Sequence, residues 1–193
     1  MTRRLSLLGL FIVLALTTSC SGSLFKVKPA AELPPLPANT RTAEANGVTL
    51  RVAPLLTDEQ IQELFEANLP LAGVLPVRIE LAFQSSTALE LKRARIHLRD
   101  DQNREWKLLP PKRAVSRIMK ANGITLYNPN SRKQFEQEFG AYAFDFKTPL
   151  ASGEAHRQGF LFFQSPNKQA VTSAQKLTLT VERLPQTASV TIN

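Results

Sequence analysis

Apolar residues recur at every second position in a series of short segments, and this period restricts the chain to a mainly β fold. The alternation is plain at residues 48–52, 77–83 and 177–181. Side chains on a strand point alternately to opposite faces, so each segment buries one face. Shorter segments with the same or a fully apolar pattern predict further strands at residues 89–98 (with a β-bulge at 92–93), 105–109, 142–146, 160–163 and 190–192.

Short helices are expected between these strands. Thr57 and Gln60 have the spacing of a capping box at the start of one helix. Residues 112–121 carry apolar residues at helical spacing, and Ser131 can cap a third helix. Thirteen prolines against eight glycines argue against a long helical bundle. We expect an antiparallel β-sandwich of seven or eight strands with two or three short inserted helices, and no second hydrophobic core.

The order of the predicted segments resembles a known class of domain. A strand at residues 75–83, a polar hairpin around Asp100 and a hydrophobic strand ending at Phe163 follow one another. In this order the chain resembles the immunoglobulin-like accessory domains of bacterial envelope proteins. The resemblance implies an immunoglobulin-like sandwich for residues 47–193, taken as a single domain. It implies a fold only, because one fold serves many functions.

The N-terminus has the organisation of an export signal. Arg3 and Arg4 precede an apolar run at residues 5–16, and no acid occurs before it. A helix needs about 20 apolar residues to cross the hydrocarbon core of a bilayer, so this run is too short for a permanent span. A positive start, a short apolar run and small residues after it predict a secretory signal peptide over residues 1–19.

The end of this signal resembles a lipobox. Residues 16–20 read Leu-Thr-Thr-Ser-Cys, and Cys20 is the chain's single cysteine. The segment is similar to the processing site of bacterial lipoprotein precursors. That resemblance implies that Cys20 becomes the mature N-terminus and carries acyl chains such as palmitate, which anchor the protein in a membrane. Asp at the next position is common in lipoproteins kept at the inner membrane, and Ser21 therefore implies the outer membrane, with a periplasmic or surface face left open.

A proline-rich segment follows the lipidated cysteine. Pro29, Pro34, Pro35 and Pro37 lie close together without sustained periodicity. Proline fixes φ and favours an extended backbone, so residues 20–46 are expected to form a semi-rigid tether.

Basic residues form two clusters that suggest an anion-binding surface. The chain has a formal net charge of +8. Alternate residues of a strand around His97, and residues three and four apart on the helix after Pro111, share a face. Such a face attracts anions through its summed potential, although a solvated, aggregation-deterring face remains the alternative. The candidate residues are Arg93, Arg95 and Arg99 on the strand and Arg113, Arg117 and Lys120 on the helix.

The sequence offers little for catalysis. Ser152 and His156 lie near each other without a G-x-S-x-G motif, and Asp100 with Asp101 is typical of a turn. One cysteine and two histidines supply few metal ligands, so neither a metal nor a cofactor is expected. Nucleic acid is not expected as a partner of an exported protein.

We therefore expect a non-catalytic lipoprotein of the cell envelope that acts as an interaction or assembly module for another envelope protein. The alternative is a carrier or sensor of a lipid or other amphipathic anionic ligand, bound by the basic residues and the dense aromatics of residues 135–163. The sequence leaves the oligomeric state open.

Overall fold

The computed structural model describes residues 33–84, 87–126, 128–152, 156–172, 174, 176–185 and 187–192. The predicted signal peptide and the lipidation site Cys20 lie outside the described residues.

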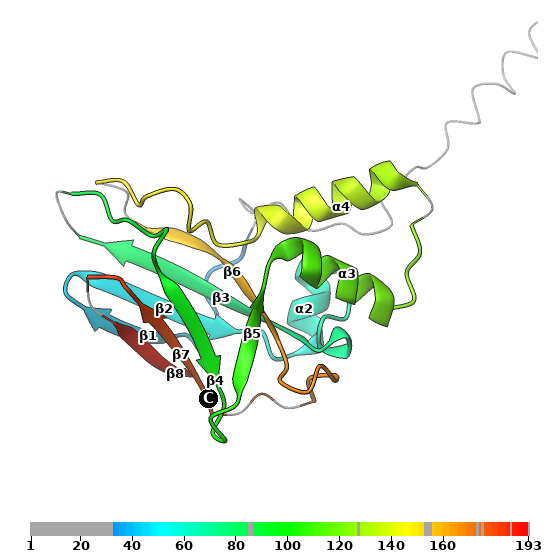
Figure 1. The fold of residues 1–193 in the computed structure, drawn as a ribbon, viewed down its shortest axis with the longest axis horizontal. Coiled ribbons are helices and arrows are strands. Elements are labelled where there is room, and N and C mark those ends of the chain that lie inside the picture. The colour runs from blue at the N-terminus through cyan, green and yellow to red at the C-terminus, as the bar shows by residue number, and fades with distance from the viewer. Residues whose placement is uncertain are drawn as a thin grey trace, which may run out of the picture.

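Eight antiparallel strands form a single sheet that nearly closes on itself (Figure 1). The order across the sheet is β1-β2-β3-β6-β5-β4-β7-β8, and the two outer strands, β1 and β8, lie side by side. The strands are β1 (Arg41–Ala45), β2 (Val48–Pro54), β3 (Val74–Phe83), β4 (Arg95–Arg99), β5 (Glu105–Leu109), β6 (Arg157–Gln164), β7 (Leu177–Glu182) and β8 (Ala188–Ile192).

This mainly β architecture is barrel-like. The prediction of an immunoglobulin-like sandwich is wrong, because β6 pairs with a strand on each of its two edges. In a sandwich, two sheets face each other without hydrogen bonds between them. Here β6 pairs with β3 from Val74↔Gln164 to Leu81↔Arg157, and its other edge pairs with β5 at Leu109↔Phe162. The strand therefore joins two halves of the chain that a sandwich would keep in separate layers.

Two hydrophobic cores lie on opposite faces of this sheet, whereas the sequence suggested one. Leu161 and Phe163 of β6 point into the barrel, where they meet apolar side chains from β2, β3 and β7. Phe160 and Phe162 point outward and pack with apolar residues of the helices. The strand is thus buried on both faces, as its continuous apolar pattern predicts.

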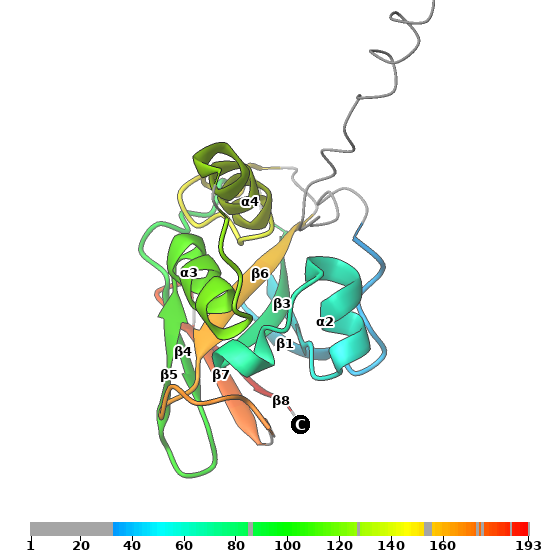
Figure 2. The ribbon, with the colours of Figure 1, turned by 90° about the vertical axis from the view of Figure 1, so that its right-hand side faces the viewer.

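The helices supply the outer cover. Figure 2 shows α2 (Asp58–Phe65), α3 (Pro111–Ala121) and α4 (Pro129–Ala141) gathered beside β3 and β6. A short 3-10 helix, η2 (Pro70–Ala72), precedes β3. Thr57 caps α2 as predicted, with its Oγ1 accepting from the backbone N–H of Gln60 at 3.3 Å. Asn128, and not Ser131, caps α4.

Among the helices of the described residues, none combines the length and the apolar character that a membrane span requires.

The predicted tether ends earlier than expected. Arg41–Ala45 forms β1, which pairs with β2 along its whole length. Asn46 and Gly47 make the turn between them with φ of 47° and 76°, the left-handed backbone of a two-residue hairpin. Residues 41–46 therefore belong to the folded domain and not to the tether.

Two other segments differ from their predictions. Lys92 and Arg93 form an exposed turn, closed by a hydrogen bond from Ala94 N–H to Leu91 O at 2.9 Å, where a β-bulge was expected. Residues 142–146 are not a strand within the described part of the chain. They meet β6 at a bridge, in which Phe144 N–H donates to Phe160 O at 3.0 Å.

Candidate functional site

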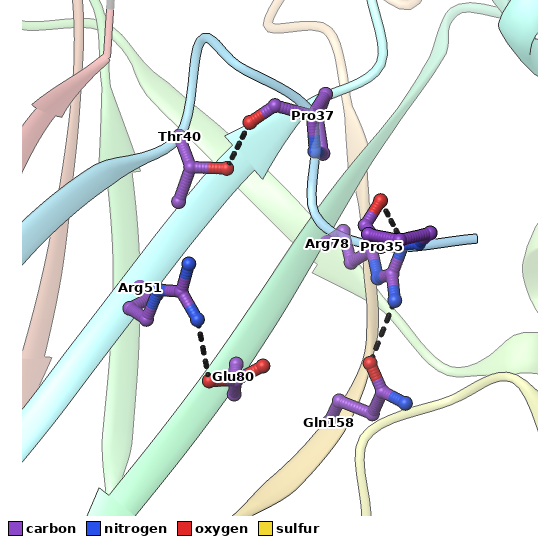
Figure 3. Close-up of polar contacts among 7 residues, drawn as sticks. All are labelled: Pro35, Pro37, Thr40, Arg51, Arg78, Glu80 and Gln158. Carbon is purple, nitrogen blue, oxygen red and sulfur yellow. Dashed lines mark hydrogen bonds and ion pairs between the residues drawn. The ribbon is translucent and has the colours of Figure 1, made fainter. Parts of the chain in front are cut away.

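Arg78 of β3 is a buried cation on the outer face of the sheet. Its side chain leaves only 3% of the residue exposed, and its Cα partner across the ladder is Phe160 of the outer core. The Nη1 atom donates to Pro34 O at 2.6 Å. It also donates to Pro35 O at 3.4 Å, and Nη2 donates to Gln158 Oε1 at 2.7 Å (Figure 3). The guanidinium therefore ties the segment before β1 to the face of the sheet.

Residues 33–40, which we call the strap, include both prolines of this contact. Leu33 packs against the outer core, and Thr40 N–H donates to Pro37 O at 3.0 Å. Figure 3 shows the strap passing over Arg78 before the chain enters β1. Part of the proline-rich segment is thus held against the domain by a side chain from β3.

The hydrogen-bond acceptors of the Arg78 guanidinium are neutral oxygens. Burial lowers the pKa of Arg78 below its ordinary value, while the charge of Glu80 acts in the opposite sense. Arginine nevertheless stays protonated in proteins, so the buried charge depends on its hydrogen bonds. Among the described residues, Nε of Arg78 finds no acceptor. The two strap carbonyls therefore carry much of the solvation of this cation.

The predicted basic face of β4 has mixed charge. Arg95, His97 and Arg99 share the outward face, as expected, but Arg93 lies in the exposed turn before β4 and not on the strand. However, the strand ladders place Glu182 across from Arg95 and Glu105 across from Arg99. His97 Nδ1 lies 3.1 Å from Glu105 Oε1, and Nε2 lies 4.0 Å from Glu182 Oε2. The carboxylates offset the cations, which does not favour the anion-binding interpretation for this strand.

On α3, the three predicted basic residues have different surroundings, because Arg117 is bonded within the fold and the other two are exposed. Arg117 donates from Nε and Nη2 to Ala72 O at 3.2 and 3.0 Å, and from Nη2 to Lys168 O at 3.1 Å. It therefore fixes α3 to the end of η2 and to a neighbouring turn, which is a structural role. Arg113 and Lys120 are exposed at opposite ends of the helix.

An apolar groove opens in the barrel wall beside β6, and we call it the wall groove. β5 occupies the edge of β6 through Leu108 and Leu109. Further along the same edge, residues 142–144 are the neighbours of β6, and Phe160 N–H donates to Tyr142 O at 2.6 Å. The space between these two neighbours of β6 has a volume of about 320 Å³.

Every residue that lines the wall groove is apolar, and the two cores meet there. Leu108, Phe144 and Leu161 belong to the barrel interior. Leu109, Ala143, Phe160 and Phe162 belong to the outer core, and Pro110, Pro111 and Phe146 complete the lining.

Gly159 allows residues 142–146 to cross β6 this closely. A Cβ atom on Gly159 would lie 2.6 Å from Phe144 Cα and 2.7 Å from Phe144 N. Those distances are shorter than any ordinary carbon contact, so a larger residue would push this wall of the groove away.

The acidic turn at Asp100 serves the β4–β5 hairpin. Its carboxylate accepts N–H bonds from Gln102 at 3.0 Å and Arg104 at 2.9 Å, and the Arg104 Nε atom lies 2.8 Å away. Burial acts to raise the pKa of Asp100, but these bonds and the Arg104 charge hold it below its usual value. The neighbouring Asp101 is exposed.

Ser152 is exposed, and part of the loop between it and His156 lies outside the described residues. No group of three or more metal-ligating side chains occurs in the part of the chain that the structure describes.

Sequence reasoning missed Arg78 because it lies at the polar phase of an alternating strand, a pattern that predicts a solvent-exposed side chain. Its burial arises from a segment 44 residues upstream. For the wall groove, the sequence contains a partial indication, because aromatic residues are dense at residues 142–163. No family model, curated protein or solved structure matches this chain.

Proposed function

We propose that this protein is a lipid-anchored protein of the bacterial envelope whose barrel-like domain acts by binding an envelope protein, without catalysis. One observation carries the proposal. The apolar run at residues 5–16, with Arg3 and Arg4 before it, ends in small residues followed by the chain's single cysteine, Cys20. This arrangement resembles the signal of bacterial lipoprotein precursors, and Ser21 favours the outer membrane.

The position of the strap limits the length of chain between such an anchor and the domain. Leu33 lies 13 residues after Cys20, and from Pro34 onward the chain is held by Arg78. Thirteen extended residues span at most about 45 Å. A lipidated Cys20 would therefore keep the domain close to the membrane surface, within reach of a membrane-associated partner.

The contacts of the polar residues support a binding role over catalysis. Asp100 accepts hydrogen bonds within its own turn, and Arg117 holds two backbone carbonyls. His97 faces glutamates on both neighbouring strands. Each of these side chains has partners that account for its position in the fold.

Fractionation of cells with and without the cysteine tests the anchor. We expect the native protein in the outer-membrane fraction, labelled by an alkyne fatty acid, and Cys20→Ala unlabelled in the soluble fraction. Ser19→Ala is the matched control, because a small residue remains before the cysteine and labelling should persist. Membrane association of Cys20→Ala without acylation would contradict the proposal.

A crosslinked pull-down of the native protein tests the partner. We expect mass spectrometry to identify one reproducible envelope protein, lost when Cys20→Ala mislocalises the bait. A native bait that recovers no envelope protein after crosslinking would overturn the interaction role while leaving the anchor intact.

A further inference from the structure

The wall groove is shaped for an apolar ligand. Phe160, Leu161 and Phe162 line the groove along β6 and are at most 2% exposed, because their side chains pack alternately into the two cores, whereas Leu108 and Phe146 at its rim are partly exposed. An apolar occupant would remove these rim side chains from water, which is the main source of affinity in such sites.

The backbone around the groove does not suit a peptide strand. Both backbone groups of Phe160 are already bonded to residues 142 and 144, and Phe162 is paired with Leu109. The chain leaving β5 continues into Pro110 and Pro111, which have no N–H groups to donate. A strand gains affinity from main-chain hydrogen bonds, and these positions offer none. The groove therefore does not offer the main-chain pairing by which an added strand would bind.

The size of the groove limits that occupant to one chain. Its volume of about 320 Å³ is at the lower end of the range of small-molecule sites, about 300–1,000 Å³. A single acyl chain suits this space better than a two-chain lipid.

Charge around the rim favours an anionic head group. Lys112 and Arg113 are exposed and directly follow Pro111 in the first turn of α3, which carries no acid. Lys147 is exposed and follows Phe146 on the opposite wall. Asp145 on the same wall accepts from Lys147 N–H at 2.8 Å and keeps its negative charge, since its pKa is lowered by hydrogen bonds from Thr148 and Lys147, so the net positive charge of the rim lies on the α3 side. The positive end of the helix dipole adds to the field of these cations.

We propose that the wall groove binds the acyl chain of a single-chain fatty acid, with its carboxylate at Lys112 and Arg113. The ligand class follows from three features of one place: an apolar lining, a satisfied backbone and a cationic rim. This site does not depend on acylation of Cys20.

Photocrosslinking of the full-length protein tests the site. The full-length protein, purified from cells, is exposed to a long-chain fatty acid that carries a diazirine in its chain, in the presence of nanodiscs of zwitterionic phospholipid. After illumination, the modified residues are mapped by mass spectrometry. We expect adducts concentrated at residues 108–111 and 143–146. Adducts spread over the surface without enrichment there, or no adducts, would overturn the proposal.

Two sets of variants separate the chain site from the head-group site. Ala143→Phe fills the groove from a partly buried position, and we expect it to abolish the mapped adducts. The double variant Lys112→Glu, Arg113→Glu leaves the groove intact and should weaken labelling by about tenfold, since each reversed rim charge contributes modestly.

The matched control is Lys92→Glu, Lys133→Glu, which makes the same change in net charge at exposed positions outside the groove. We expect this control to label like the native protein. Equal labelling of the two double variants would overturn the head-group assignment, and thermal melting of each variant shows whether it is folded.

Discussion

The Arg78 guanidinium donates a 2.6 Å hydrogen bond to the carbonyl oxygen of Pro34, which lies 44 residues earlier in the chain. This bond joins the middle of a strand to the segment between the proposed anchor and the domain. It decides where the folded domain begins, because the strap from residue 33 to residue 40 lies against the sheet. The tether was predicted to end at Asn46. Because Arg78 holds the strap, only the residues before Leu33 remain for a tether.

Replacing Arg78 should release the strap. Arg78→Met keeps much of the side-chain volume but removes the donors to the strap carbonyls. We expect amide hydrogen exchange of residues 36–40 to rise at least about tenfold, since hydrogen bonds to a charged group each contribute about 1.5–3 kcal/mol. Exchange followed by mass spectrometry measures this change.

Arg51→Met is the control for that variant. Arg51 lies on the neighbouring strand, and its Nη1 contacts Glu80 Oε1 at 3.0 Å with 43% of the side chain exposed. Removing this partly buried ion pair should change stability by about 1 kcal/mol and leave exchange in the strap as it was. Unchanged exchange in Arg78→Met would show that the strap is held by other contacts.

Gly159→Ala should destabilise the domain at the wall groove. The new Cβ would lie 2.6 Å from Phe144 Cα, so residues 142–146 must move away from β6. We expect a loss of about 1–3 kcal/mol in the free energy of unfolding, measured by urea denaturation. Gly140→Ala is the control, because a Cβ at this position in α4 meets no atom within 4 Å. It should be neutral or stabilise the domain by up to about 1 kcal/mol. Equal stability of the two variants would show that the crossing can relax.

Acid should weaken the β4–β5 hairpin through Asp100. Its pKa is lowered in the folded protein, so its stabilising contribution is fully present above the unfolded pKa of about 3.9. That contribution is lost as the pH falls through the folded value. Asp100→Asn should therefore reduce the fall in unfolding free energy below about pH 4.

Denaturation curves across the pH range measure this effect, with Asp101→Asn as the exposed neighbouring control. Some acid dependence remains in Asp100→Asn, because hydrogen bonds from Thr148 and Lys147 also lower the pKa of Asp145. An Asp100→Asn profile that falls as steeply as the native one would contradict the assignment.

Local patterns were sufficient to predict most individual elements. The alternation at residues 48–52 and 177–181 marks β2 and β7, and the helix predicted at 112–121 is α3. The strand β1 was missed although Asn46 and Gly47 are a strong hairpin signal, because the prolines before them dominated the interpretation. Residues 142–146 alternate like a strand, yet they cross β6 at Gly159 and place Tyr142 and Phe144 in different cores.

The candidate sites depend on pairings that no local pattern contains. The basic residues of β4 were correctly predicted to share a face, but the glutamates opposite them come from β5 and β7. Arg117 has the helical spacing of a surface cation and instead binds the carbonyl of Ala72. The wall groove exists because β5 and residues 142–144 share one edge of β6.

The sequence by itself determined most of the strand and helix segments, because these depend on residues close together in the chain, and it predicts a lipidation signal that ends at Cys20. Only the tertiary structure decided that the strands join into one nearly closed sheet, that β6 is buried between two cores and that Arg78 is covered by the strap. Strand order and side-chain burial arise from contacts between distant segments, and a periodic pattern carries no information about which segment will be its neighbour.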